Sequence, residues 1–188
     1  SAPKFLAGPA RMNVIGNAIA FQVVWMSSVG GAARGWWWAG PLALLAFMLW
    51  QLPRSDCRRA DMRLMAVAAV VGFLVDSLWV QAQWLQFTAP TPSVHMAPIW
   101  IVTMWMGFAL TLNHSLRLFK QRLLWSAAFG LVGGPLAYWI AANAWSAVSL
   151  PAEHALALVS IGIAWALLTP ALLSLSNRWA PDATRAHG

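Results

Sequence analysis

Charged side chains are scarce in this chain. They make up 9% of its 188 residues, whereas 60% of the residues are hydrophobic and the mean hydropathy is +0.62. A soluble domain of this size needs charged groups over most of its surface, so the composition excludes an ordinary soluble globular protein. The few charges fall in short clusters between long apolar runs. This pattern predicts an all-α integral membrane bundle in which the apolar runs are helices.

Cysteine is equally scarce. The single cysteine, Cys57, excludes an intrachain disulfide and a cysteine-based metal site. His95, His114 and His154 lack the spacing of metal ligands, so we predict no metal site and interpret Cys57 as an inert thiol. We find no phosphate-binding glycine loop, nucleophile elbow or haem-attachment motif. The sequence therefore names no cofactor and leaves open whether the protein is an enzyme.

Six apolar windows have roughly the length of a membrane span. About 20 residues cross ~30 Å of hydrocarbon at ~1.5 Å per residue. The windows are residues 13–33, 36–52, 64–85, 97–118, 123–145 and 154–175. The predicted fold is one domain of six transmembrane helices over residues 12–179, followed by a short cytoplasmic tail at 180–188. Residues 1–11 are interpreted as an extension ahead of a natural start at Met12.

The positive charges are distributed unevenly between the two sides of this predicted bundle. The N-terminal segment, the second loop, the fourth loop and the tail hold eleven of the Lys and Arg residues, whereas the opposite side holds only Arg34. Because positively charged loops resist translocation, both termini are predicted in the cytoplasm of a bacterial inner-membrane protein. The basic excess is expected to meet anionic phospholipid headgroups, and no nucleic-acid partner is predicted.

Asp76 is the clearest candidate site within a span, because an ionisable side chain in hydrocarbon is costly. It shares a helical stripe with Gly72 and Gln83, so we expect it to face other helices, with Gln22 or Tyr138 as its hydrogen-bond partner. A catalytic or transport role and a structural hydrogen-bonding role both remain open.

A second candidate is the sequence Asn113-His114-Ser115, at the expected cytoplasmic end of the fourth span and just before Arg117. The imidazole of His114 could move protons or meet a lipid headgroup, and the alternative is a helix-end histidine with a structural role. If this segment is helical, only two of the three side chains can serve one ligand. We place Asn17 in the same tier, and Gln22, Asp76 and Tyr138 about 15 Å away, which argues against one His-Asp pair. The predicted binding residues are Asn17, Gln22, Asn113, Ser115, Arg117 and Tyr138.

Several short motifs occur together in one order. They are Asn17 with Phe21-Gln22, Trp25 and Gly31-Ala32, then Leu74-Val75-Asp76-Ser77, Pro98 with Trp100, Thr111-Leu112-Asn113-His114-Ser115-Leu116, and Gly133-Gly134-Pro135 with Tyr138. In these motifs the chain resembles a small bacterial inner-membrane family, the domain-of-unknown-function family twenty-eight seventy-eight, from about residue 12 to residue 179. The resemblance implies a multi-span fold and, more weakly, genes that lie beside those of lipid-modifying methyltransferases and oxidoreductases. It transfers no catalytic residue.

The function expected from these observations is the handling of lipid or a lipid-soluble substrate near the cytoplasmic leaflet, in company with peripheral lipid-modifying enzymes. One alternative is a small proton-coupled transporter or channel that uses Asp76. Another is a membrane scaffold subunit without a site. A lateral opening at His114 would favour lipid handling, a continuous polar path through Asp76 would favour transport, and a sealed bundle would favour the scaffold.

Overall fold

The computed structural model describes residues 9–151 and 154–181, and the side chains of residues 9–12 and 154 are outside the description. The described chain is mostly helical, with one pair of two-residue strands, which confirms the predicted all-α class. The elements, in order, are α1 (Pro9–Ala32), α2 (Ala39–Gln51), η1 (Leu52–Arg54), α3 (Arg58–Gln81), β1 (Gln86–Phe87), α4 (Ile99–Ala109), η2 (Arg117–Gln121), α5 (Leu123–Asn143), β2 (Val148–Ser149) and α6 (His154–Trp179).

Four of the six helices, α1, α3, α5 and α6, are long and apolar enough to cross a membrane. The outer surface fits a lipid environment, because Leu49, Leu78 and Leu167 are 68, 67 and 66% exposed. Helices α2 and α4 have 13 and 11 residues, and at ~1.5 Å per residue they are too short to span ~30 Å of hydrocarbon alone. The structure thus supports four spans, and the predicted count of six stays a prediction.

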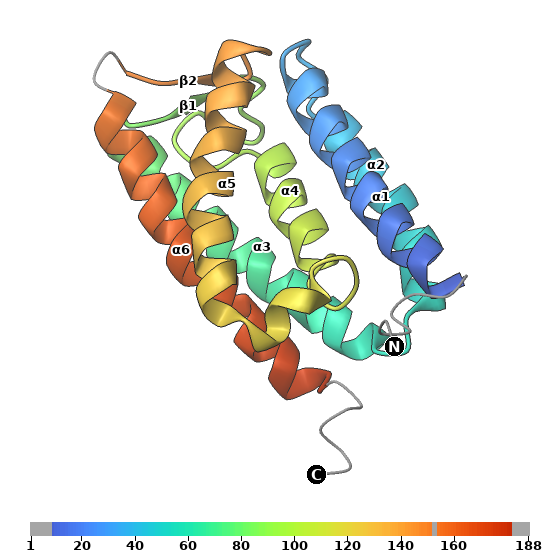
Figure 1. Ribbon diagram of the computed structural model, residues 1–188. Coiled ribbons are helices and arrows are strands. Elements are labelled where there is room, and N and C mark those ends of the chain that lie inside the picture. The colour runs from blue at the N-terminus through green and yellow to red at the C-terminus, as the bar shows by residue number, and fades with distance from the viewer. Residues whose placement is uncertain (1–8, 152–153, 182–188) are drawn as a thin grey trace.

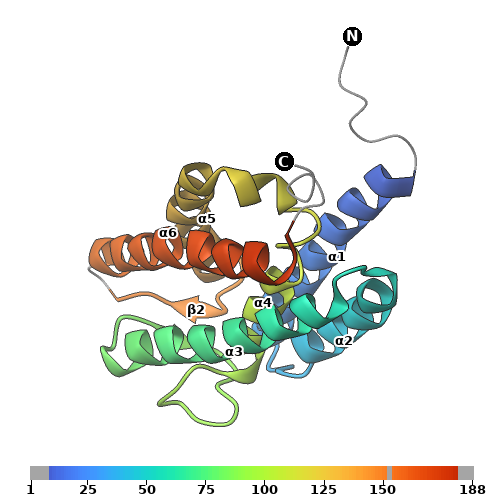
Figure 2. The same ribbon diagram turned by 90° about the horizontal axis from the view of Figure 1, so that it is seen from below.

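The short helix α4 lies at the centre of the molecule (Figures 1 and 2). Helices α1, α2 and α3 pack around it. Helices α5 and α6 pack chiefly on each other, and this pair contacts the other helices mainly where α6 packs on α3. The α4 side chains Trp100, Ile101 and Trp105 are at most 2% exposed. A helix enclosed in this way does not face lipid, so its backbone can end at mid-bundle if protein groups satisfy its carbonyls.

Helix α4 ends nine residues earlier than the predicted fourth span. Residues 110–116 form turns, in which the Thr111 hydroxyl donates to the Phe108 carbonyl over 2.6 Å. Thr, Asn and Ser side chains offer such local hydrogen bonds in place of helical ones, and three of them, Thr111, Asn113 and Ser115, lie in this segment. The prediction of a helix through His114 was therefore wrong.

The two ends of the bundle differ. α1 begins and α6 ends at the same end (Figure 1), where η1 and η2 also lie with Arg54, Arg58, Arg117 and Arg122. We call this the basic end. At the opposite end, the strand end, β1 pairs antiparallel with β2 and so joins the α3–α4 loop to the α5–α6 loop. The interpretation of residues 1–11 falls mostly outside the described residues, although α1 already begins at Pro9, and most of the predicted tail is outside as well.

Candidate functional site

A polar network fills the interior of the basic end. It joins Asn17 of α1, Gln51 of α2, Asp61 of α3, Ser176 of α6 and the turn residues Asn113, His114 and Ser115. The four members that lie on helices are at most 4% exposed. The network therefore connects four helices, through buried side chains, to the central turn, whose three side chains are partly buried.

Asp61 is the centre of this network. Its Oδ1 accepts a hydrogen bond from the Asn113 amide (2.8 Å), and its Oδ2 lies 3.0 Å from His114 Nε2. The Ser55 hydroxyl also donates to Oδ2, and the Cys57 thiol lies 3.8 Å from Oδ1. A carboxylate with no exposed surface needs donors of this kind, because burial without them is costly.

The orientation of the Asn17 amide is fixed by backbone groups. The Ser115 backbone N–H and hydroxyl both donate to Asn17 Oδ1, over 3.3 and 2.7 Å, and Asn17 Nδ2 donates to the Leu110 carbonyl over 3.2 Å. A backbone N–H can only donate and a carbonyl can only accept, so the two ends of this amide are not interchangeable.

This orientation determines where the proton of His114 lies. Asn17 Nδ2 also donates to Gln51 Oε1 (2.9 Å), so the Gln51 NH₂ group faces His114 Nδ1 at 3.4 Å. Nδ1 must then accept, and the ring proton must sit on Nε2, from which it is donated to Asp61. Both ring nitrogens of His114 are thus engaged within the protein.

Three groups in the network lie close enough to hold a metal ion. One ligand atom each from Cys57, Asp61 and His114 fall within 4.8 Å of one another. The spacing of the histidines and the single cysteine along the chain did not predict this group of three possible ligands. The hydrogen-bond directions oppose coordination, because His114 Nε2 carries a proton. Burial raises the pKa of the Cys57 thiol, which disfavours the thiolate that a metal would need.

The turn changes what Asn113-His114-Ser115 can do. On a helix, Asn113 and Ser115 would diverge, but in the turn all three side chains enter one network, so the expectation that one must be packing was wrong. Ser176 further donates to Asn113 Oδ1 over 2.6 Å. Arg117, the predicted neighbour, is half-buried at the start of η2, and its side chain makes no ion pair or hydrogen bond with the described residues.

Asp76 forms a second polar cluster, closer to the strand end. It has no exposed surface, and its two oxygens accept hydrogen bonds from Trp105 Nε1 (2.7 Å) and Tyr138 Oη (2.6 Å). One turn earlier on α3, a Cβ on Gly72 would overlap the Trp105 ring, so glycine is what allows α4 to approach. The predicted Asp76–Tyr138 contact and the inward-facing stripe through Gly72 are thus present, whereas Gln83 lies beyond α3 and is exposed.

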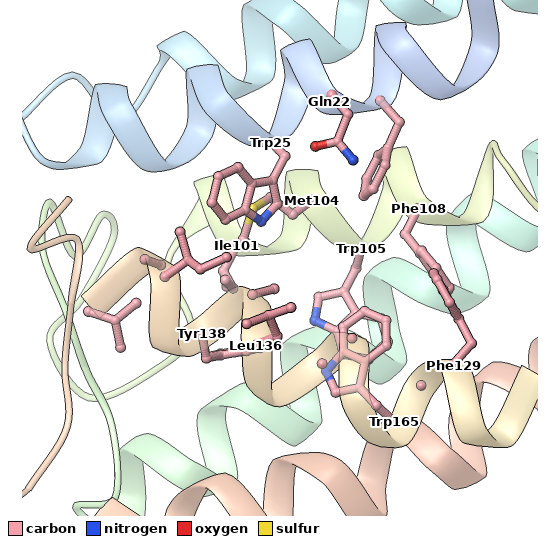
Figure 3. Close-up of a pocket in the computed structure, with 18 of the residues that line it drawn as sticks. Gln22, Trp25, Ile101, Met104, Trp105, Phe108, Phe129, Leu136, Tyr138 and Trp165 are labelled. Atoms are coloured by element: carbon pink, nitrogen blue, oxygen red, sulfur yellow. The ribbon is translucent and has the colours of Figure 1, made fainter. Parts of the chain in front are cut away.

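A cavity of about 300 Å³ lies beside this cluster, between α1, α4, α5 and α6 (Figure 3). Its lining includes four tryptophans, three phenylalanines and Tyr138. Trp105 and Trp165 stack in its wall, with ring centroids 4.2 Å apart. Phe129 and Leu136 of α5 line it and are 43 and 50% exposed, so the cavity opens sideways, toward the apolar exterior of the bundle.

Asp76 itself lies behind the cavity wall, where it holds two lining rings, Trp105 and Tyr138. Gln22 lines the cavity from α1 and is not a partner of Asp76, so that alternative was wrong. Asp61 and Asp76 are fifteen residues apart on α3, or about 22 Å along the axis. Buried Leu64, Met65 and Ala68 lie on α3 between them. In the described residues the two polar clusters are therefore separate. His114 is distant from Asp76, as expected, but it does form a His-Asp pair, with Asp61.

The sequence did not identify several members of the two clusters as candidate site residues. Asp61 falls between the predicted windows 36–52 and 64–85, and the structure places it in the first turn of α3. Gln51 and Ser176 sit near helix ends, where polar residues are common and uninformative. Trp105 falls within the predicted window 97–118, where a tryptophan by itself does not indicate a buried hydrogen bond.

Comparison with known proteins gives one match. The model of the family described as "Protein of unknown function (DUF2878)" matches residues 14–171, which is most of the chain. The chain belongs to the DUF2878 family. In this DUF2878 protein the match includes the lining of the cavity, Asp76, and every member of the basic-end network except Ser176. Neither a curated protein nor a solved structure matches the chain.

Proposed function

We propose that this DUF2878 protein is a bacterial inner-membrane protein that binds a lipid-soluble molecule in the lateral cavity. The observation that carries the proposal is the cavity itself, which is aromatic-lined, about 300 Å³ in volume and open toward the surface that faces lipid. Ligand sites are typically concave and mainly apolar with few polar groups, and this volume is at the lower end of their range. A chain or ring diffusing in the bilayer can enter without crossing a headgroup layer.

The placement differs from the expectation from the sequence. The opening lies beside the Asp76 cluster rather than at His114. In this proposal the basic end closes that end of the bundle and attracts anionic headgroups, and the ligand binds elsewhere, in the cavity. Peripheral lipid-modifying enzymes remain the partners we propose for that end. The separation of the two polar clusters and the engagement of both Asp76 oxygens give no support to a proton path through Asp76.

Gly133 offers a direct test, because a Cβ at this position meets no atom within 4 Å although the residue lines the cavity. Gly133→Phe should fill the cavity without disturbing α5. The neighbouring Val132 is 64% exposed and does not line it, so Val132→Phe adds the same ring to the outer surface as a matched control.

The experiment uses nanodiscs that contain a trace of phosphatidylcholine with a diazirine on its acyl chain. After irradiation, mass spectrometry should find adducts on the cavity residue Met104, and Gly133→Phe should remove most of them while Val132→Phe leaves them. Adducts on exposed Leu78 serve as the internal reference. Equal Met104 labelling in all three proteins, or no Met104 labelling in the wild type, would contradict the proposal.

A further inference from the structure

The polar side chain at the α1 side of the cavity is Gln22. It is exposed, and its amide makes no hydrogen bond with any residue that the structure describes. Figure 3 shows the amide across the cavity from Trp105 and Trp165. Placing an amide in an apolar medium without a hydrogen-bond partner costs on the order of several kcal/mol, as its transfer from water to hydrocarbon does. A ligand with a hydrogen-bonding group would remove that cost.

The depth of Gln22 limits what that group can be. Gln22 lies ten residues before Ala32, the last residue of α1, which places it about 15 Å from the strand end of the helix. In a hydrocarbon layer ~30 Å thick this is near the midplane. A phosphate or other charged headgroup does not reach this depth without a large penalty. The polar group that meets Gln22 must therefore be uncharged.

The walls of the cavity limit the ligand further. The stacked indoles of Trp105 and Trp165 and the edge-on ring of Phe108, whose centroid lies 5.1 Å from that of Trp165, present aromatic faces and edges to the cavity. Flat conjugated rings gain offset-stacked and edge-to-face contacts there that a saturated chain does not. A rigid ring also loses less conformational freedom on binding than a flexible acyl chain.

Building on the proposed binding of a lipid-soluble molecule, we propose that the cavity holds the head ring of a lipid-soluble quinone, with the Gln22 amide donating a hydrogen bond to a ring carbonyl. This ligand class is uncharged, planar and conjugated, and it carries carbonyl acceptors on a hydrophobic tail. Met104 and Phe108 of α4 then form the floor beneath the ring. The inference concerns binding and orientation of the ring.

The test is competition against Met104 photolabelling with two compounds that share a decyl tail and a six-membered ring. Decylubiquinone has ring carbonyls and decylbenzene has none. Decylubiquinone should suppress Met104 adducts at about tenfold lower concentration, since one hydrogen bond to an otherwise unpaired group is worth roughly that factor. Gln22→Leu should abolish the difference and leave decylbenzene unaffected.

Each outcome bears on a different statement. Equal potency of the two compounds on the wild-type protein, or a preference that survives Gln22→Leu, overturns the quinone inference while the cavity remains a lipid site. Absence of Met104 adducts before any competitor is added overturns the proposed function as well. The wild-type comparison needs no variant, so the test stands even if Gln22→Leu does not fold.

Discussion

Buried carboxylates in this protein act as acceptors that orient their neighbours. Asp61 fixes Asn113 and His114, and Asp76 fixes Trp105 and Tyr138, through hydrogen bonds of 2.6 to 3.0 Å. In each case the donors come from another segment of the chain. A buried acid with such partners stabilises one packing arrangement, and its removal leaves the donors unpaired.

Asp61→Asn should destabilise the protein by about 3 kcal/mol, because the new NH₂ group would face donors where the carboxylate accepted hydrogen bonds. Asp56→Asn is the matched control, since Asp56 is exposed five residues earlier, and it should change stability by less than about 0.5 kcal/mol. Reversible unfolding in mixed micelles measures both. Similar stability of the two variants would mean that Asp61 is not the centre of the network.

The protonated nitrogen of His114 can be observed directly. Nitrogen-15 NMR of the labelled protein should show the ring proton of His114 on Nε2 rather than Nδ1, and Gln51→Leu should weaken that preference because it removes the donor to Nδ1. Addition of one equivalent of Zn²⁺ should leave the His114 signals in place. A zinc-dependent shift that Cys57→Ser abolishes would instead establish a metal site at Cys57, Asp61 and His114.

At the scale of the elements, the contact of α3 with α4 depends on one missing side chain. The absence of a side chain at Gly72 leaves space for the Trp105 ring. Asp76, one turn later on the same face of α3, accepts a hydrogen bond from the indole N–H of Trp105. Space and hydrogen bond together set the position and rotation of α4, and through Trp105 they also shape the cavity wall.

Two glycine substitutions separate packing from helix propensity. Gly72→Ala should destabilise the fold by about 1 to 3 kcal/mol, because the added methyl group overlaps the Trp105 ring. Gly133→Ala should be neutral or stabilise by up to about 1 kcal/mol, since it meets open space and alanine favours the helix. The shift in unfolding midpoint in detergent gives both values. A Gly72→Ala variant as stable as Gly133→Ala would show that α4 does not pack as described.

The sequence predicted the features that depend on an unbroken helix. Asp76, Gly72 and the inward face of α3 follow from a 3.6-residue repeat, and α3 is continuous. The same reasoning failed for His114, because α4 ends at Ala109 and the turn directs neighbouring side chains to one side. The cavity was beyond prediction, since it arises from the packing of four helices that local patterns do not relate to one another.

At the scale of the molecule, the two ends are built differently. At the basic end, one hydrogen-bonded network spans α1, α2, α3, α6 and the central turn. Toward the strand end, α1 is separated from α5 by the cavity, and β1 and β2 join the loops above it. The hydrogen bonds between helices are therefore concentrated at the basic end, and the cavity lies toward the strand end.

The orientation of the whole bundle is testable with cysteine labelling, and we expect the basic end to face the cytoplasm because most Lys and Arg residues of the loops lie there. Cys57 is a poor probe, since it is half-buried and burial raises the pKa of its thiol, which leaves little reactive thiolate at neutral pH.

In a Cys57→Ser background, exposed Asp56 and Val94 are better positions for the labelled cysteine. A membrane-impermeant maleimide added to intact spheroplasts should modify a Val94→Cys protein and spare an Asp56→Cys protein. After permeabilisation both should react, which controls for accessibility. Labelling of Asp56→Cys in intact spheroplasts, with Val94→Cys protected, would invert the bundle and place the basic end outside.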